Sequence, residues 1–241
     1  MKKLFLISSI LLALGITARA QTDPCASGYC PTQITVHHKV GSVSPVAGDI
    51  TYEVIKSTAT GATLCWLGRN LGATSKATSY TDATYTANGW YWQFGSKQGY
   101  SMTSGGVITP SSGWITTITP YIATWSNDPC TLLLGTNWRL PTGAEWSAAM
   151  SSTLTSPANA YTALYLHANA SLYQTGSTVS WECPPASTSD TYAGARLSST
   201  GTAAGAAKMY TQTANNASSP AVLTVNTQIM AAARCVRTYS Y

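Results

Sequence analysis

The segment Asn137–Trp146, NWRLPTGAEW, constrains the fold of this chain more than any other stretch. Its first residues read as a short strand, and Pro141 interrupts that strand because proline lacks the N–H that a central strand must donate. Thr142 and Glu145 follow with the S/T-x-x-E spacing of a capping box, in which each side chain accepts a hydrogen bond from the backbone N–H of the other residue. The segment therefore predicts a strand that leads directly into a helix over residues 143–154.

The same segment gathers an Arg, a Glu and two Trp in a chain that has few charges, so a catalytic interpretation must also be weighed. Glu145 has a sufficient structural role, because a carboxylate in the first turn of a helix also interacts favourably with the helix dipole. We therefore interpret Thr142 and Glu145 as a structural helix cap and not as part of an acid–base site.

Short strands are expected on both sides of this helix. The segments with strand-like alternation or composition are residues 34–40, 50–57, 63–71, 89–95, 163–168, 195–199, 206–213, 221–227 and 233–240. Between them lie Ser-, Thr-, Gly- and Pro-rich segments that read as loops. Many short strands, long loops and one or two helices predict an α+β fold.

Residues 1–20, MKKLFLISSILLALGITARA, have the charged start, the short apolar run and the A-x-A ending of a secretory signal peptide. We expect cleavage before Gln21. No later stretch approaches the roughly 20 apolar residues that a membrane helix needs. The mature protein is therefore predicted to be soluble and exported to the cell surface or the extracellular space, without a membrane span.

Charge argues against some partners. Removal of the signal peptide takes Lys2, Lys3 and Arg19 with it and leaves ten Lys and Arg against eight Asp and Glu. The basic residues are scattered and do not form a cluster that would bind a phosphate backbone, so nucleic acid is not expected as a partner. Only 9% of the residues are charged. A surface solvated mainly by hydroxyls is typical of exported β-rich proteins, and it also suits a packed extracellular assembly because hydroxyls cost less to desolvate than charges.

The chain has six cysteines, at positions Cys25, Cys30, Cys65, Cys130, Cys183 and Cys235. In an exported protein they predict disulfides, and zinc binding is the competing interpretation. The spacing disfavours zinc: Cys25 and Cys30 are the only close pair, and His37 and His38 point to opposite faces of a predicted strand, so they cannot both bind one ion. We therefore expect disulfides and no metal site.

The sequence lacks the patterns that would support an enzyme. The acidic residues never occur as two within a short motif, and no nucleotide-binding or nucleophile-elbow signature is present. No acidic cluster offers the several oxygen ligands that calcium requires. His167 is a lone imidazole, for which a structural role is the commoner one. We predict that the protein is not an enzyme, has no catalytic residues and uses no cofactor.

Four large aromatic residues lie in segments that read as loops, namely Trp114, Trp125, Trp181 and Tyr192. Such residues either fill a small core beneath the loops or face a partner, and flat aromatic faces suit sugar rings and protein hot spots. Core packing is the commoner role, but these four are the best candidates for ligand-binding residues. Four tryptophans in regular elements are instead predicted to be core residues: Trp66, Trp92, Trp138 and Trp146.

Several segments taken in order resemble the FISUMP family, exported domains of Bacteroidetes-type bacteria that are usually placed with C-type lectin-like folds. These segments are CWLGRNLGAT (65–74), GWYWQFGSKQGY (89–100), NDPC (127–130), GTNWRLPTGAEW (135–146) and ARCVR (233–237). The resemblance covers roughly residues 49–239. Residues 21–48 fall outside it, so we interpret them as an N-terminal extension to a domain over residues 49–241.

The resemblance implies a C-type lectin-like fold in which the N- and C-terminal strands pair and a long-loop region projects from one end. In that plan a cysteine near the start of the helical layer bridges to a cysteine on the last strand, and by position these are Cys130 and Cys235. The pairings taken for the other cysteines are Cys65 with Cys183 and Cys25 with Cys30.

The segments RLPTGAEWSAAM and RCVR are also similar to segments of formylglycine-generating enzymes, which share the lectin-like core. Those enzymes require a catalytic cysteine pair and a downstream RGGSW-type segment. The corresponding stretch of this chain has neither, so we interpret the shared segments as scaffold.

These observations predict an exported binding or adhesion protein at the bacterial surface that recognises a glycan or a protein. The alternative is a structural subunit of an extracellular filament or surface assembly, in which the extension pairs with the sheet edge of a neighbouring copy. An enzyme of the formylglycine-generating type is the third hypothesis.

Overall fold

The computed structural model describes residues 30–116, 125, 127–169, 171–175, 178–183, 194–201, 206–212, 220–226 and 228–239. The predicted signal peptide, Cys25 and Tyr192 lie outside these residues, as do the side chains of Trp181 and Cys183. Within the described ranges, the helices are all too short or too polar to cross a bilayer.

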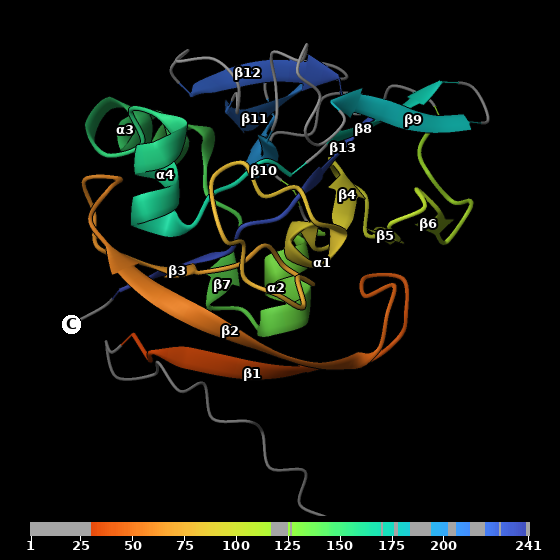
Figure 1. Cartoon of the computed structure of the whole chain (residues 1–241), viewed down its shortest axis with the longest axis horizontal. Coiled ribbons are helices and arrows are strands. Elements are labelled where there is room, and N and C mark those ends of the chain that lie inside the picture. Colours follow the sequence, from red (N-terminus) through yellow and green to blue (C-terminus); the bar gives the residue numbers. More distant parts are fainter. Residues whose placement is uncertain are drawn as a thin grey trace, which may run out of the picture.

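The described chain is a mixed fold, mostly β with few helices, in which two sheets form opposite sides of the molecule (Figure 1). The first sheet has five strands in the order β1 (Gln33–His38), β2 (Gly48–Ser57), β3 (Leu64–Leu67), β14 (Val236–Thr238) and β7 (Trp138–Arg139). The second sheet has the order β12 (Ala221–Asn226), β11 (Ala206–Gln212), β10 (Gly194–Gly201), β13 (Ile229–Ala232), β4 (Tyr91–Gln93), β5 (Gly99–Met102) and β6 (Ile108–Thr109), and β8 (Ser171–Thr175) joins β13 to β9 (Thr178–Cys183).

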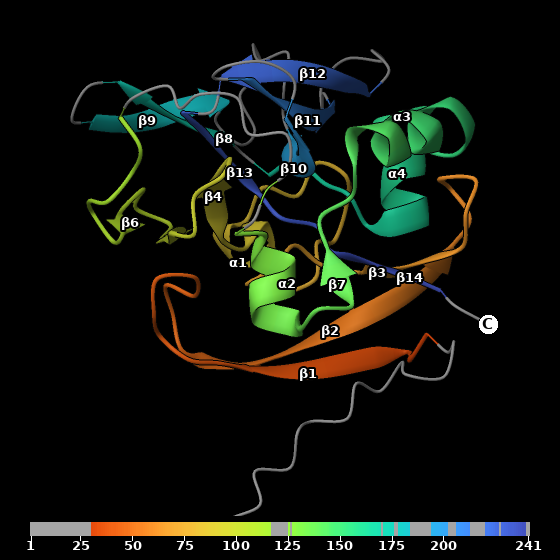
Figure 2. The ribbon, with the colours of Figure 1, turned by 180° about the vertical axis from the view of Figure 1, so that it is seen from behind.

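Four helices complete the described fold. Helices α1 (Tyr85–Asn88) and α2 (Pro129–Leu134) lie between the sheets, and α3 (Gly143–Ser152) and α4 (Pro157–Leu164) lie together at one end (Figures 1 and 2). Helix α3 packs against β10, β11 and β12.

The last described strand, β14, lies inside the first sheet, between β3 and β7. Strand β14 pairs antiparallel with β3, where Val236 lies opposite Trp66, and also with β7, where Val236 lies opposite Arg139. Strand β14 therefore links β3 to β7, the strand that precedes α3.

Strand β1 belongs to the same sheet, although the sequence placed it in an extension. It pairs antiparallel with β2 from Gln33 opposite Glu53 to His38 opposite Gly48. His38 is buried whereas His37 is exposed, which confirms that the two imidazoles point to opposite faces. The described part of residues 21–48 is thus built into the fold, and β1 is an edge strand of the first sheet.

The predicted capping box at the start of α3 is confirmed. The N–H of Glu145 donates to the Thr142 hydroxyl at 3.1 Å, and the N–H of Thr142 donates to the Glu145 carboxylate at 2.8 Å. Arg139 on β7 donates two further hydrogen bonds to the same carboxylate, at 2.7 and 2.6 Å. Arg139 and Glu145, for which a catalytic role was considered, therefore link β7 to α3.

Residues 163–168, predicted to be a strand, are the end of α4 and an irregular segment after it. The Ser156 hydroxyl accepts a hydrogen bond from the N–H of Asn159 at 3.1 Å. Pro157 occupies the first turn of α4, where a backbone N–H would have no partner within the helix, so the N–H that proline lacks is not needed. The helix ends at Leu164, and its C-cap Tyr165 has a left-handed backbone (φ 52°). The strand prediction is wrong because the Ser-Pro signal for a helix start outweighs the apolar pattern of ALYLHA.

Large aromatic residues build the core. The ring of Trp146 on α3 lies 5.1 Å from the ring of Trp66 on β3 and stacks on Tyr210 of β11 at 4.5 Å between centroids. All three are fully buried. The four tryptophans predicted to be core residues are confirmed as buried: Trp66, Trp92, Trp138 and Trp146.

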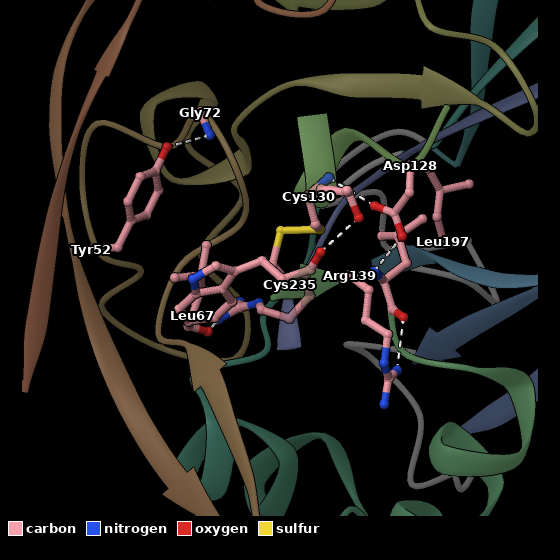
Figure 3. Close-up of a disulfide and its surroundings, with 12 residues drawn as sticks. Tyr52, Leu67, Gly72, Asp128, Cys130, Arg139, Leu197 and Cys235 are labelled. Carbon is pink, nitrogen blue, oxygen red and sulfur yellow. Dashed lines mark hydrogen bonds between the residues drawn. A yellow bond between two sulfur atoms is a disulfide. The ribbon is translucent and has the colours of Figure 1, made fainter. Parts of the chain in front are cut away.

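The disulfide that the resemblance implied is present between Cys130 on α2 and Cys235, directly before β14 (Figure 3). Asp128 caps α2 beside it: one carboxylate oxygen accepts from the N–H of Cys130 at 2.8 Å and the other from the N–H of Leu140 at 2.7 Å. The disulfide links α2 to Cys235, the residue before β14 of the first sheet. The Asp128 cap links α2 to Leu140, just before the Thr142–Glu145 capping box.

The second disulfide joins Cys30 to Cys65. The expected pairings Cys25–Cys30 and Cys65–Cys183 are therefore wrong. The physical reason is that β1 pairs with β2, which in turn pairs with β3, so the residue before β1 is brought beside a cysteine on β3. Treating residues 21–48 as a separate extension could not anticipate this contact.

Arg234 is fully buried without a carboxylate partner in the described part of the chain. Its guanidinium donates to the carbonyl oxygens of Leu67, Leu164 and Tyr165 at 2.8, 3.1 and 3.3 Å. Two of these carbonyls end α4, where a cation is also favoured by the helix dipole. Arg234 thus joins the end of α4 to β3.

Candidate functional site

A groove lies between the β1–β2 hairpin, α1 and β5. It consists of two pockets of about 270 and 320 Å³. The first is lined by Val46, Ala47, Gly48, Asp49, Ile50, Gly72, Thr74, Tyr85, Thr86, Gly89, Trp90, Ser101, Met102 and Thr103. The second is lined by Ala83, Thr84, Tyr85, Thr86, Asn88, Met102, Thr103 and Ser104. Because the pockets share four lining residues, they are adjacent, and we refer to the two together as the groove.

Trp90 forms the floor of the first pocket, and the residues packed against its ring fix its position. It is only 5% exposed. Gly72 lies against its ring, because a Cβ at Gly72 would meet ring atoms at 2.1 Å. The imidazole of His38 approaches the ring edge-on at 4.9 Å between centroids. The Tyr52 hydroxyl accepts from the N–H of Gly72 at 2.9 Å and lies 2.9 Å from Nε2 of His38, so three elements fix the floor (Figure 3 shows the Tyr52–Gly72 bond).

The hairpin that forms one wall is anchored on β5. The N–H of Gly99 donates to the carbonyl of Ser42 at 2.8 Å, and a Cβ at Gly99 would meet the carbonyl oxygen of Val43 at 2.2 Å. The buried Ser44 hydroxyl donates to the carbonyl of Val46 at 2.7 Å. Residues 46–50 therefore present a fixed surface to the groove.

Tyr85 provides the exposed aromatic face of the groove. It lines both pockets and is 47% exposed. Val46, another exposed apolar side chain, lines the first pocket, and Val107 lies close by, because its carbonyl accepts from the N–H of Thr103 at 3.1 Å. Exposed apolar side chains that gather in one place are typical of a binding surface.

The polar groups of the groove are almost all hydroxyls, from Thr74, Thr84, Thr86, Ser101, Thr103 and Ser104. Asp49 is the one carboxylate among the described lining residues, and one of its oxygens contacts Nδ1 of the exposed His37. Among the described residues, no Lys or Arg lines either pocket. The groove is therefore close to neutral and offers hydrogen bonds rather than charge.

The floor is also uncharged at neutral pH. Burial, together with the neighbouring His37, lowers the pKa of His38 to about 4. Burial likewise raises the pKa of Tyr52 above its ordinary value. Both groups are neutral at pH 7, so they support the Trp90 ring without adding a charge beneath it.

Titratable groups outside the groove have structural roles. The buried His167 places Nδ1 2.8 Å from the carbonyl oxygen of Asp82, and burial beside Arg196 lowers its pKa to about 3. Glu53 forms a two-bond ion pair with Arg69 at 2.7 Å. In the described part of the chain, no group of three or more His, Cys, Asp or Glu could hold a metal ion.

Of the four aromatic residues predicted to bind a ligand, the two whose side chains the structure describes, Trp114 and Trp125, line neither pocket. Trp125 is buried in the core, with its ring 5.2 Å from that of Phe94. Trp114 is partly buried and lies 6.1 Å from the ring of Tyr100. The Trp181 side chain and Tyr192 lie outside the description.

Sequence reasoning missed Tyr85 and Trp90. Neither follows a recognisable motif, and the groove forms only when the hairpin, α1 and β5 meet. One signal was available: Gly89 precedes Trp90 and has a left-handed backbone (φ 76°), and a Cβ there would meet the Leu71 carbonyl at 2.5 Å. A glycine of this kind marks a close approach of two chain segments.

Comparisons of the chain with protein-family models, with curated proteins and with solved structures found no match.

Proposed function

We propose that this chain is an exported binding or adhesion protein of the bacterial surface, without enzymatic activity, and that the groove holds its ligand, a glycan. The observation that carries the proposal is the combination of the exposed Tyr85 ring, the Trp90 floor and a rim of hydroxyls in one nearly neutral groove. A sugar ring has an apolar face and a hydroxyl edge. Aromatic side chains with a few placed polar groups complement both.

The location outside the cell is supported by the disulfides Cys30–Cys65 and Cys130–Cys235, which persist in oxidising compartments. The signal-like residues 1–20 agree with it. The absence of enzymatic activity is supported by the structural use of the groups that an enzyme would need. Glu145 caps a helix, His167 is buried, and these four cysteines are oxidised.

We also propose that the chain is a FISUMP-type domain of C-type lectin-like fold. The proposal is supported by the mixed α+β architecture, by β14 lying in the same sheet as β2 and β3, and by the Cys130–Cys235 bridge between the helical layer and the last strand.

A glycan array probed with the mature chain from Gln21 tests the function. We expect binding to at least one class of glycan, loss of that binding in Tyr85→Ala, and retention in Leu132→Ala. Leu132 is a matched control because it is a 46% exposed apolar residue on α2 that lines neither pocket. Binding of no glycan, or equal binding by Tyr85→Ala and the unmodified protein, contradicts the proposal. Selective binding of a protein ligand also contradicts it, because the ligand is then not a glycan.

A second candidate function, a subunit of a surface filament, is favoured by one observation. Strand β1 is an edge strand whose six residues, QITVHH, include no Lys, Glu, Asp or Pro that would discourage pairing with another chain. Size-exclusion chromatography with negative-stain microscopy tests it. Assemblies that disappear in Thr35→Lys support this candidate, and a monodisperse monomer at high concentration contradicts it.

A further inference from the structure

The groove is divided into two compartments by a shared central wall. Tyr85 and Met102 border both pockets, together with Thr86 and Thr103. Ligand pockets typically measure about 300–1,000 Å³. The two pockets, at about 270 and 320 Å³, lie just below and just above the lower limit of that range, so each has room for one small ring and the pair for a ligand with two.

Each compartment has its own polar groups. In the first, the Thr74 hydroxyl and the second carboxylate oxygen of Asp49 make no hydrogen bond to a described residue. In the second, the exposed Ser104 hydroxyl is similarly available, beside Thr84. Polar groups at both ends with an aromatic ring between them match a chain of linked rings that carry hydroxyls along their edges.

The charges of the groove discriminate against anionic sugars. Asp49 lines the first pocket with a side chain that is 67% exposed, and a uronate or sulfate placed there would meet like charge. In the described part of the chain, neither pocket is lined by an Arg or Lys, the side chains that bind carboxylate and sulfate groups. A neutral ligand satisfies the hydroxyls without these penalties.

We infer that the groove binds a linear neutral oligosaccharide across two adjacent subsites, one over Trp90 and one beside Ser104, with Tyr85 between the two sugar units. The inference rests on the proposed glycan-binding function and adds the minimum length and the charge class of the ligand.

Isothermal titration of the mature chain tests the length. The probes are neutral mono-, di-, tri- and tetrasaccharides of glucose, mannose, xylose and N-acetylglucosamine, with galacturonic acid oligomers as the anionic arm. We expect one neutral series to gain at least about tenfold in affinity, or about 1.4 kcal/mol, between the monosaccharide and the di- or trisaccharide and then to level off. Equal affinity for the monosaccharide and its oligomers overturns the two-subsite inference and leaves the proposed function standing.

The other outcomes are also decisive. Preference for the galacturonic acid series overturns the neutral class. Binding of no saccharide in either arm, combined with an empty glycan array, contradicts the proposed function itself. The failure of the inference is therefore distinguishable from the failure of the function on which it rests.

Substitutions that fill one pocket at a time locate the subsites. Ser104 lines only the second pocket and Ala47 only the first, and both are exposed. We expect Ser104→Tyr to lower trisaccharide affinity about tenfold, to the monosaccharide level, and to leave monosaccharide affinity unchanged. Ala47→Tyr should weaken both. Ser151→Tyr, on the exposed side of α3, is the control and should change neither. Unchanged trisaccharide affinity in Ser104→Tyr would overturn the second subsite.

Discussion

Gly72 lies directly against the indole of Trp90, with room for a hydrogen where any other residue has a Cβ. A Cβ at position 72 would lie 2.1 Å from an atom of the ring. The backbone of Gly72 has φ +82°, a conformation that residues other than glycine rarely adopt. We expect Gly72→Ala to lower the free energy of unfolding by about 2–4 kcal/mol, because the strained backbone and the displaced ring both contribute. Urea unfolding followed by tryptophan fluorescence measures the change.

Gly61→Ala is the control that separates these two contributions. Gly61 has nearly the same backbone (φ +80°) but no neighbour within 4 Å of the added Cβ. We expect it to cost only about 1 kcal/mol, the strain of the backbone alone. Equal losses for Gly72→Ala and Gly61→Ala would show that the Trp90 floor is not packed as described.

Two buried histidines should make the protein sensitive to acid. The pKa of His38 is lowered by burial to about 4 and that of His167 to about 3, from an ordinary value of 6.5. Below pH 6.5 the unfolded chain binds a proton at each histidine that the folded chain excludes. Their stabilisation is therefore complete above pH 6.5 and is lost as the pH falls toward those folded values. Urea unfolding at pH 7 and pH 5 should differ by about 2 kcal/mol per histidine.

A His38→Gln variant isolates one of the two contributions. The Gln amide can still reach the Tyr52 hydroxyl, but it does not titrate. We expect the loss of stability between pH 7 and pH 5 to fall by about half in this variant. A free energy of unfolding that stays constant over this interval in the unmodified protein would refute the burial of both imidazoles.

Local chemistry allowed part of this fold to be predicted. Thr142 and Glu145 satisfy each other within four residues, so the start of α3 could be read from spacing alone. Ser156 and Pro157 carry an equally local signal for α4, which the apolar run ALYLHA obscured. Capping is therefore predictable from the sequence wherever its donors and acceptors are close neighbours along the chain.

The candidate site could not be predicted in the same way. The groove requires residues 46–50, Tyr85 and Met102 to meet, and that meeting depends on long-range pairing of β1 with β2 and on the contact of Gly99 with the hairpin. The burial of Trp125 is likewise a consequence of packing against Phe94. A loop-like sequence around an aromatic residue does not reveal whether the ring faces the core or the solvent.

The disulfide Cys30–Cys65 provides a direct test of the N-terminal arrangement. Peptide mapping under non-reducing conditions should recover a cross-linked pair of peptides that contain Cys30 and Cys65, and a second pair that contain Cys130 and Cys235. Recovery of a Cys25–Cys30 loop would contradict the Cys30–Cys65 bridge and its anchoring of the start of β1 to β3.

Removal of the longer cross-link should have the larger effect on stability. Cys130 and Cys235 are 105 residues apart and Cys30 and Cys65 are 35 apart. In the chain-entropy model these closures are worth about 4.8 and about 3.8 kcal/mol. We expect the double alanine variant of the first pair to lose about 1 kcal/mol more than that of the second, measured by urea unfolding. The reverse order would indicate that packing around the cysteines outweighs loop closure.

The ion pair between Arg139 and Glu145 should be needed for stability and not for ligand binding. Burial would raise the pKa of Glu145, but the hydrogen bonds from Arg139 and Thr142 lower it below its ordinary value, so the carboxylate is charged at neutral pH. Glu145→Ala removes the second half of the capping box and two charged hydrogen bonds, and we expect it to lower the free energy of unfolding by about 2–3 kcal/mol. Glu145→Gln keeps an acceptor for the Thr142 N–H and should lose less. Ser151→Ala, on an exposed part of the same helix, should stay within about 0.5 kcal/mol of the unmodified protein. Because neither residue of the ion pair lines the groove, the glycan affinity of the folded Glu145→Ala variant should be unchanged. If this variant is fully folded but no longer binds the glycan, the segment Asn137–Trp146 belongs to the binding site.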